Sequence, residues 1–449
     1  MSRFHRHNTF SVKGEKPITY WMQQTHRFQD NYALMYAIEK ANEHHLPLNV
    51  LFVLNKDYPY ANTRNMTFML EGLKTLKQKY LKAGIGFILE VGDFKSKVIN
   101  QFKDASMLIM DQSYMRGLRD IKTEIGFKAT KQNLACITVE NDVIVPVQEA
   151  SDKAEYAART IRKKLLGKLD AYHELPKIPT LNNKIHRDEA IILDQPIKTI
   201  LNKIGLNDSI QKSDYYVGGE AEAFKVMASF VKENLNNYKD ANDPSKNLTS
   251  KLSMYLHFGM ISPLRIYNTI EENALDNVSK KNFLEQLFIR RELAFNYVIF
   301  HEGYDQFETM TEEWAYKTMD LHVNDPRKYL YTIKDYLAFN THDEAFNACM
   351  KEMVKTGYMH NYMRMYWGKK IIEWSPDYKT AYETIIYLNN TYFIDGRDPV
   401  SYASVAWLFG KHDQGWKERE IFGKLRYMNF QGLKRKFDIK TYIAQCEKL

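Results

Sequence analysis

A run of hydroxyl side chains around one lysine is the first candidate for chemistry in this sequence. The run N-L-T-S-K-L-S, residues 247–253, leads into a helical pattern. Hydroxyls, an ammonium group and the free N–H groups at the start of a helix together suit a phosphate. Thr and Ser are also common at helix starts as simple caps. Taken alone, the run favours a cap, and a phosphate site needs support from other residues.

Basic and aromatic side chains gather near the carboxyl end of the chain. Eight Lys and Arg residues lie between positions 411 and 436, against three acidic residues, and Trp416, Tyr427 and Phe430 are interleaved with them. This mixture is expected of a surface that contacts nucleic acid, whereas a solvated charged face is the alternative. The basic residues are Lys411, Lys417, Arg419, Lys424, Arg426, Lys434, Arg435 and Lys436.

Composition limits the classes of function. The chain has 449 residues, with 63 Lys and Arg against 55 Asp and Glu, and its net charge of +8 is compatible with a polyanionic partner without requiring one. Its three cysteines are far apart and form no CxxC, which argues against a disulfide framework and against a zinc or iron–sulfur site. We find no secretory signal and no apolar run of membrane length, so we expect a cytoplasmic or nuclear protein that is not secreted and has no membrane partner.

The amino-terminal part of the chain alternates between strand-like and helix-like segments. Compact apolar runs such as LNVLFVL are typical of buried parallel strands. The β-α-β-α order predicts an α/β domain with a doubly wound parallel sheet, in which ligands bind at the carboxyl ends of the strands. No G-x-G-x-x-G follows a strand, so the usual dinucleotide fingerprint is absent. The expected strands are 18–21, 48–54, 85–91, 106–111 and 135–140, and the expected helices between them include 28–42, 65–84 and 94–102.

Three parts of the chain differ in pattern. Residues 1–145 form the expected α/β domain. Residues 146–215 contain a basic helical segment and several prolines, which predicts a connector between domains. From 216 to 449 almost every segment has helical period, which predicts an all-α domain that contains both clusters described above.

Six segments of the second half, in order and at matching spacing, resemble the motifs of the photolyase/cryptochrome family. The last three resemble the class II members specifically, and Y-W-M at 20–22 and Q-D-N at 29–31 add class II likeness in the first half. The resemblance therefore covers nearly the whole chain. The six segments are T-S-K-L-S-M-Y-L-H-F-G-M-I-S (249–262), R-R-E-L (290–293), T-H-D (341–343), G-Y-M-H-N-Y-M-R-M-Y-W (357–367), D-G-R-D-P (395–399) and E-R-E-I-F-G-K-L-R-Y-M (418–428).

The resemblance implies light-driven repair of cyclobutane pyrimidine dimers in UV-damaged DNA. A noncovalently bound, reduced FAD would pass an electron to the flipped-out dimer, and the protein would hold the cofactor and dock the lesion. An Arg364–Asp395 pair beside the flavin would favour its anionic form, although a plain helix–loop ion pair is the commoner explanation of such residues. The implied FAD-binding residues are Tyr238, Thr249, Ser250, Lys251, Leu252, Ser253, Arg364, Asn389, Asp395, Gly396 and Arg397.

The resemblance also implies roles at the lesion and on the DNA. Glu292 would face the dimer, Met365 and Trp407 would form the apolar wall beside it, and Asn389 would hydrogen-bond flavin N5 as part of the catalytic site. An ion pair with a neighbouring arginine is the alternative for Glu292, and a core position is the alternative for the Met and Trp. The implied DNA-contacting residues are Lys411, Gln414, Lys424 and Arg426.

Two positions depart from the family pattern. Phe346 stands where class II members have the middle tryptophan of a chain that reduces the flavin under light, while Trp367 and Trp374 keep the outer positions. Phe is much harder to oxidise than Trp, so we expect slow photoreduction, with Tyr366 or Tyr362 as the open alternative relay. Gln414 replaces a family Arg that fills the gap left by the flipped dimer, which predicts weaker lesion affinity unless a neighbour such as Arg426 compensates.

Three hypotheses follow from these residues. A dimer-repairing photolyase is the first, a cryptochrome-like blue-light photosensor on the same scaffold is the second, and a flavoprotein or DNA-binding module without photochemistry is the third. No motif decides whether an antenna chromophore, a deazaflavin or a folate, binds the α/β domain. We expect a monomer that associates with DNA.

Overall fold

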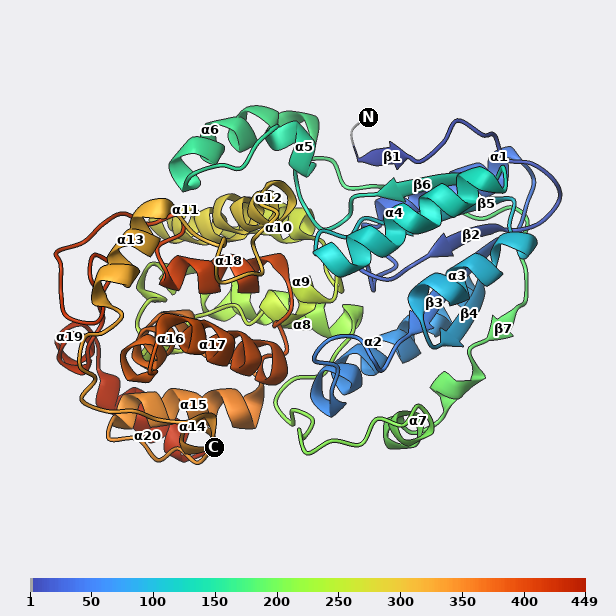
Figure 1. Ribbon diagram of the computed structural model, residues 1–449. Helices are drawn as coiled ribbons and strands as arrows, with labels where there is room; N and C mark the ends of the chain where they lie inside the picture. Colours follow the sequence, from blue (N-terminus) through green and yellow to red (C-terminus); the bar gives the residue numbers. More distant parts are fainter. Residues whose placement is uncertain (1–2) are drawn as a thin grey trace.

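The computed structural model describes residues 3–449 and consists of an α/β lobe and a helical lobe (Figure 1). The α/β lobe has a seven-stranded sheet of order β1-β6-β5-β2-β3-β4-β7, parallel except for β1, which pairs antiparallel with β6. The predicted α/β fold with a parallel sheet is confirmed. The strands are β1 Phe4–Arg6, β2 Ile18–Trp21, β3 Leu48–Leu54, β4 Gly86–Val91, β5 Met107–Asp111, β6 Ala135–Val139 and β7 Asp188–Glu189.

Helices cover both faces of this sheet because successive side chains of the buried strands point to opposite faces. Val50 of β3 packs in the hydrophobic cluster of α1 and α2, whereas Leu51 packs in that of α3 and α4. All seven residues of β3 are buried, so the uninterrupted apolar run is explained by helices on both sides. These helices are α1 Tyr32–Glu43, α2 Thr63–Lys82, α3 Phe94–Asn100 and α4 Arg116–Lys131.

The segment expected to be a connector is partly built into the α/β lobe. It contributes β7, which adds to the edge of the sheet beside β4, and α7, whose buried Ile200 belongs to the core of that lobe. The pairing was not foreseen because β7 is only two residues long and both residues are exposed. The helices of this segment are α5 Val147–Ala150, α6 Ala158–Lys168 and α7 Ile197–Lys203.

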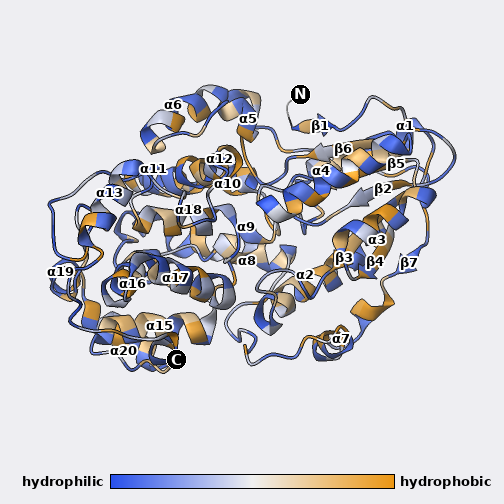
Figure 2. Cartoon of the chain, in the orientation of Figure 1, coloured by the Kyte–Doolittle hydropathy of each residue, from blue (hydrophilic) through white to orange (hydrophobic). Residues whose placement is uncertain are grey.

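The carboxyl-terminal lobe is helical, as predicted, and hydrophobic and hydrophilic residues alternate around its helices (Figure 2). No helix in residues 3–449 is long and apolar enough to span a membrane. The helices are α8 Glu220–Glu233, α9 Ser253–His257, α10 Pro263–Asn273, α11 Asn277–Leu284, α12 Arg291–Phe300, α13 Glu313–His322, α14 Ile333–Leu337, α15 Glu344–Thr356, α16 Asn361–Trp374, α17 Tyr378–Tyr392, α18 Pro399–Leu408, α19 Phe430–Lys436 and α20 Ile439–Glu447. A π-helical turn, Glu285–Arg290, joins α11 to α12, and 3-10 turns occupy Phe102–Asp104, Leu169–Ala171, Ile191–Asp194, Leu235–Asp240 and Pro244–Lys246.

A buried arginine joins the two lobes. Arg64, in the first turn of α2, donates from Nη1 to the carbonyls of Met353 (3.1 Å) and Tyr392 (2.9 Å) and from Nη2 to that of Val354 (2.5 Å). Its Nε donates to the carbonyl of Gln211 at 2.9 Å. The last carbonyls of a helix lack partners within the helix, and a cation there also complements the helix dipole. Arg64 therefore fixes the ends of α15 and α17 against the α/β lobe.

We predict that Arg64→Met lowers the free energy of unfolding by more than about 3 kcal/mol, because it leaves several buried carbonyls without a donor. Arg64→Lys should recover part of this loss, since an ammonium reaches some of the same carbonyls. Urea unfolding followed by circular dichroism would measure the change. Arg159→Met, at an exposed position of α6, is the matched control. An unchanged midpoint in Arg64→Met would show that the lobes are held together elsewhere.

Candidate functional site

The hydroxyl-rich run 247–253 forms a loop that closes over Tyr358. Asn247 and Lys251 have positive φ values of 49° and 57°, so the loop turns sharply on either side of Thr249. Thr249 Oγ1 is 2.9 Å from the Tyr358 hydroxyl, and Lys251 Nζ lies 3.8 Å from the centre of the Tyr358 ring. Burial lowers the pKa of Lys251 to about 8, and within residues 3–449 no carboxylate forms an ion pair with it. A half-buried ammonium group without an ion-pair partner favours binding of an anionic ligand at this place.

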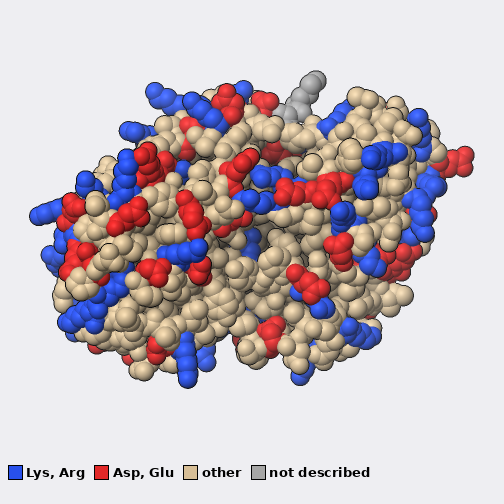
Figure 3. Space-filling model, in the orientation of Figure 1, with Lys and Arg blue, Asp and Glu red and all other residues tan. Residues whose placement is uncertain are grey.

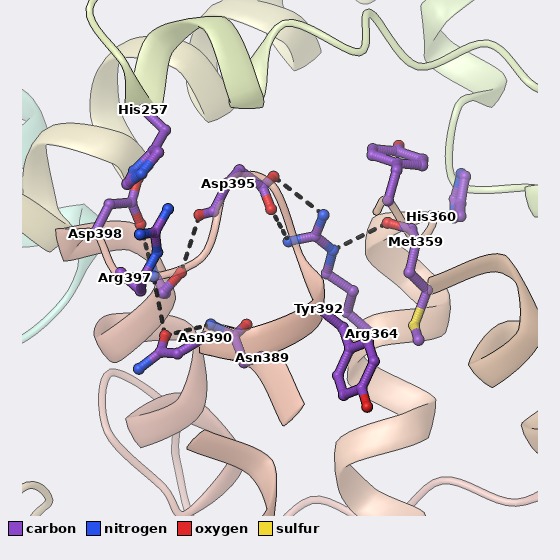
Figure 4. A network of polar contacts seen from close by, with 12 residues as sticks. His257, Met359, His360, Arg364, Asn389, Asn390, Tyr392, Asp395, Arg397 and Asp398 are labelled. Carbon is purple, nitrogen blue, oxygen red and sulfur yellow. Dashed lines mark hydrogen bonds and ion pairs between the residues drawn. The ribbon is translucent and has the colours of Figure 1, made fainter. Parts of the chain in front are cut away.

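A bidentate ion pair lies next to this loop. Arg364 of α16 donates from both Nη atoms to the two carboxylate oxygens of Asp395, each at 3.0 Å, and from Nε to the carbonyl of Met359 (Figure 4). The Arg364 guanidinium lies 4.0 Å from the ring centre of Phe393 and 5.5 Å from that of Tyr358. Burial alone would lower the pKa of Arg364, but the Asp395 carboxylate reverses the effect and raises it. The Arg364 guanidinium therefore stays charged in a poorly solvated place.

The hairpin 389–398, made of the last turn of α17 and the loop that leads to α18, presents Asp395 to Arg364. Asn390 Oδ1 accepts from the side chain of Asn389 at 3.0 Å and from the backbone N–H of Arg397 at 2.9 Å, which ties the two sides of the hairpin together. A Cβ at Gly396 would lie 2.6 Å from the carbonyl oxygen of Asn389, so only glycine fits this close approach. Asp398 caps α18 and fixes the far end.

A cleft between the lobes begins on the other side of the same hairpin. It is lined by residues that follow the carboxyl ends of β2, β3 and β5 and by residues of α9, α12 and the hairpin. Several buried polar atoms that face it have no hydrogen-bond partner within residues 3–449. These atoms are Nδ1 of His26, Nδ1 of His257, Oδ1 of Asp142, and Nε and Nη2 of Arg397. Unpaired buried groups are costly, so a concentration of them indicates a ligand.

Burial changes the charge of these groups. It lowers the pKa of His26 to about 4 and also lowers that of His257, so both imidazoles are neutral at neutral pH. It raises the pKa of Asp142 to about 7 and lowers that of Arg397 to about 10. The cleft therefore offers neutral donors and acceptors with one guanidinium, among aromatic walls such as Tyr58 and Phe295. This arrangement suits a flat, polar-edged ring system.

Figure 4 shows that the hairpin separates these two groups of residues. Arg364 and His360 lie on one side of it, and His257 and Asp398 lie on the other. Arg397, predicted to bind the same cofactor as Arg364, lines the cleft between the lobes instead. The positive φ of 66° at Arg397 turns the chain at this residue, and its predicted role in binding FAD stays a prediction.

Trp407 and Met365, the predicted apolar wall, are both half-buried. The Arg426 guanidinium lies 5.2 Å from the Trp407 ring and 4.2 Å from that of Trp416, and it forms a bidentate ion pair with Asp413 at 2.9 Å. These contacts hold the 411–416 loop against α18. The Arg426 guanidinium is therefore already paired with a carboxylate and stacked on two aromatic rings. The Gln414 side chain, next to Asp413 in the sequence, is exposed.

Of the predicted DNA-contacting residues, Lys411 is placed differently from expectation. It is 6% exposed and pairs with Glu312 at 2.6 Å, so its side chain is engaged within the protein, and its contact with DNA stays a prediction. Lys424 and Gln414 are exposed, as a DNA contact requires. Figure 3 shows blue Lys and Arg side chains mixed with red Asp and Glu along the left edge of the molecule, which is the mixed surface that the sequence left open.

Glu292 does not face an open site. Its carboxylate is buried and accepts hydrogen bonds from the backbone N–H groups of Ile144 and of Val145, the latter at 3.3 Å, in the segment that leaves the sheet. The neighbouring Arg291 donates to the carbonyl of Asp142 at 2.6 Å. Burial raises the pKa of Glu292 to about 8, against the opposing effect of these N–H groups. Both oxygens are engaged by the backbone, and the predicted contact of Glu292 with a lesion stays a prediction.

The other residues predicted to bind FAD or to transfer electrons differ in how far they are buried. Tyr238 is half-buried with its ring 5.1 Å from Phe283, Leu252 is buried in the core, and Ser250 and Ser253 lie on the loop surface. Trp367 and Trp374 are buried on α16, and the Phe346 ring lies 5.0 Å from that of Trp374.

The sequence motifs did not reveal which residues come together in the cleft or which ring lies under the 247–253 loop. Tyr358 lies inside a quoted motif, but nothing in the sequence marks it as the ring that Lys251 and Arg364 share. His26, Asp142 and His257 come from three distant segments, so no local spacing connects them. The only available signal was the rule that ligands bind at the carboxyl ends of parallel strands, which is where His26 and Asp142 lie.

Known proteins resemble this chain along its length. Residues 18–180 match the family model described as DNA photolyase. A deoxyribodipyrimidine photo-lyase of Methanothermobacter thermautotrophicus is 39% identical over 99% of both chains. A class III photolyase of Agrobacterium tumefaciens has a similar fold, with a TM-score of 0.76 at 18% identity over 97% of this chain and 87% of that one. So does an archaeal photolyase of Sulfolobus tokodaii solved with two FAD molecules, with a TM-score of 0.71 at 15% identity over 96% and 89%.

The position of Glu292 predicts a structural role that can be measured. Glu292→Ala should lower the free energy of unfolding by about 2 kcal/mol or more, because two buried N–H groups lose their acceptor. Glu292→Gln keeps one acceptor oxygen and should lose less. Thermal unfolding would report both changes, with the exposed Glu313→Ala on α13 as control. A Glu292→Ala protein of unchanged stability would restore a direct functional role for this carboxylate.

Proposed function

The chain belongs to the DNA photolyase family, and from this premise we propose that it is a deoxyribodipyrimidine photo-lyase that repairs pyrimidine dimers in DNA. The observation that carries the proposal is the 39% identity to the Methanothermobacter photo-lyase over 99% of both chains. Within the family we propose the class II type and cyclobutane dimers as substrate. The terminal motifs, D-G-R-D-P among them, support this finer assignment.

The site beside Tyr358 fits the FAD that such a function requires. The unpaired Lys251 ammonium and the hydroxyls of Thr249 and Ser250 would hold the pyrophosphate. The Arg364–Asp395 pair and the Asn389 amide would lie along the flavin ring. When bound, reduced and excited by light, the flavin supplies the single electron that opens the dimer.

The side chains around the flavin site set its electrostatics. Because the pKa of Arg364 is raised, a fixed positive charge is available to a negatively charged flavin ring. Asp395 holds that charge in place through two hydrogen bonds, so the guanidinium need not reorient when the flavin charge changes. Arg364 therefore orients and stabilises, and it has no proton to give at neutral pH.

A flipped dimer would stack on the half-buried Trp407 and Met365. Lys369 Nζ lies 5.8 Å from the Trp407 ring centre, and burial lowers its pKa to about 7, so its charge under this wall changes near neutral pH. The exposed Lys424, Lys434 and Arg435 would contact phosphates on either side. Arg426, engaged with Asp413, would shape the wall and contribute little to phosphate binding.

We assign the cleft between the lobes to a second, light-harvesting chromophore. Its unpaired donors and acceptors and its aromatic walls match the edge and faces of a deazaflavin or a folate ring. The Sulfolobus tokodaii structure is described with a novel light-harvesting cofactor, which supports the assignment by likeness of fold.

Light-dependent repair tests the main proposal. The FAD-loaded protein, reduced with dithionite, should restore a thymine cyclobutane-dimer oligonucleotide to intact thymines under blue light and leave it unchanged in the dark. A matched oligonucleotide with a (6–4) photoproduct should remain unrepaired. Repair of the second substrate alone would overturn the cyclobutane assignment, and repair of neither would overturn the proposed function.

Lys251 should control the affinity for FAD. Lys251→Met should weaken FAD binding by about tenfold to a hundredfold, the loss of one charge-assisted hydrogen bond. In the native protein, the affinity for FAD should be constant below about pH 8 and fall above it. Above that pH, Lys251 of the unliganded protein has lost its proton and must take one up to bind the anionic cofactor. Flavin fluorescence titrations would measure both effects.

The control for this experiment is Lys246→Met, which removes an exposed lysine of the preceding turn that pairs with Asp240. It should leave affinity and pH dependence unchanged. If Lys251→Met keeps the fall in affinity above pH 8, another group holds the pyrophosphate.

A further inference from the structure

The turn 418–424, between α18 and α19, carries the exposed Lys424 and has a strained backbone. The backbone N–H and carbonyl groups of Arg419 and Gly423 bond to each other, at 2.9 and 2.7 Å, and close the turn. Between them, Ile421 has a φ of 67°. A β-branched residue rarely adopts this left-handed backbone, because its Cβ crowds the following carbonyl oxygen. Such a conformation persists only where the surrounding contacts impose it.

The contacts that impose this conformation come from α13, from the turn after it and from α17. The N–H of Ile421 donates to Asp325 Oδ2 at 2.7 Å, and its carbonyl accepts from the Tyr378 hydroxyl. The N–H of Lys424 donates to Thr318 Oγ1 at 2.9 Å. The turn is therefore held by side chains of the helical lobe, and Asp325 holds the strained residue itself.

One histidine joins Asp325 to the start of the turn. His322, the last residue of α13, has Nδ1 2.6 Å from Asp325 Oδ2 and Nε2 3.0 Å from Glu418 Oε1. An ionised carboxylate only accepts hydrogen bonds, so each ring nitrogen must carry a proton for both bonds to form. A neutral ring could donate to one carboxylate only. The geometry therefore requires the imidazolium form of His322.

The surroundings of His322 favour this charged form. Its hydrogen bonds with Glu418 and then with Asp325 raise its pKa, against a smaller opposing effect of burial. The pKa of Asp325 is lowered, first by the N–H of Ile421 and then by His322, so this carboxylate is ionised. The titratable and charged groups on the elements around His322 are Asp320 of α13, Asp325 and Arg327 after it, Tyr378 of α17, and Glu418, Arg419, Glu420 and Lys424 of the turn 418–424.

Loss of one proton from His322 would leave a ring nitrogen with a lone pair facing a carboxylate. The Asp325 side chain is 24% exposed and stays bonded to the N–H of Ile421, whereas the Glu418 side chain is 52% exposed and can turn to water. We therefore expect the contact with Glu418 to break. The start of the turn is then free, and the strained backbone of Ile421 has fewer contacts to hold it.

The same turn packs behind the proposed wall for the dimer. Phe422 is buried, and Lys369 Nζ lies 6.0 Å from the centre of its ring and 5.8 Å from that of Trp407. The carbonyl of Lys424 accepts from the N–H of Trp416 at 2.8 Å. A change in the turn would therefore move the exposed Lys424 and Trp416 together.

We propose, on the basis of the proposed function, that protonated His322 is a latch that holds the turn 418–424 in the form that presents Lys424 to DNA, and that loss of its proton releases the turn and weakens DNA binding. The stabilisation from the latch is fully present while His322 is protonated. It is lost as the pH rises through the pKa of His322, which lies above the ordinary histidine value.

Hydrogen exchange and DNA binding in the dark, on the same FAD-loaded protein between about pH 6 and pH 9, test the latch. In the native protein, exchange of the amides of 418–425, corrected with an unfolded peptide of the same sequence, should quicken as the pH rises. Affinity for a dimer-containing duplex, measured by fluorescence anisotropy, should fall about threefold to tenfold over the same range. His322→Gln lacks the cation, so its turn should exchange quickly and its affinity should be low at every pH.

Two matched variants separate the latch from a general effect of charge. Glu418→Gln can accept from the imidazolium or donate to the neutral ring, so the contact, the slow exchange and the affinity should persist across the pH range. Glu313→Gln removes the same charge from an exposed site on α13, where Glu313 pairs with Lys317, and should behave as the native protein does. Flavin content is recorded for every variant.

Exchange of the turn that does not respond to pH in the native protein overturns the latch. A fall in DNA affinity that persists in His322→Gln also overturns it and assigns the pH dependence to another group, such as Lys369, whose pKa burial lowers to about 7. Exchange that follows pH while affinity stays constant refutes the link to DNA binding. Absence of light-driven repair after dithionite reduction, with both pH responses present, refutes the proposed function and leaves the latch standing.

Discussion

The hydrogen bonds of Arg64 to the ends of α15 and α17 are the constraint on which the rest of the structure depends. The hairpin 389–398 starts where α17 ends, so a side chain of the α/β lobe sets the position of Asp395 relative to Arg364. Arg27 acts in the same way from the loop after β2, donating to the carbonyls of Asn141 and Gly259, each at 2.9 Å. The lobes are thus joined by buried cations that bond to backbone carbonyls, which fixes their mutual position more strictly than apolar contact alone.

Both candidate binding sites contain charges or polar groups that the protein itself does not pair. Lys251 has an aromatic ring where a carboxylate would be expected, and the cleft contains two neutral imidazoles, Asp142 and Arg397. Arg64, by contrast, is a buried cation whose donors all find backbone carbonyls of the protein. The contrast within one molecule is the strongest physical argument that these two places are completed by ligands, since unpaired groups reduce stability in their absence.

The sequence predicted the strands of the sheet well because apolar runs such as β3 are buried on both faces and leave little choice. It also predicted that the 247–253 loop and the Arg364–Asp395 pair belong together, through the family motifs. The sequence did not predict which way individual side chains point. The π-helical turn Glu285–Arg290 inserts an extra residue before Glu292, so ordinary helical spacing does not tell which way that carboxylate points. The burial of Lys411 was not foreseen for a similar reason: a run of charged residues does not reveal which member turns inward, here to Glu312.

The hairpin 389–398 has one side in each binding site. Asp395 faces the flavin site, and two and three residues later Arg397 and Asp398 face the cleft between the lobes. Because residues of the hairpin are hydrogen-bonded to one another, a shift caused by a ligand on one side would also change the surface on the other side. If the two proposed ligands favour different geometries of the hairpin, their binding would be linked, and the linkage would be reciprocal: each ligand would change the affinity for the other by the same factor. A chromophore that merely harvests light would then also act as an effector of cofactor retention.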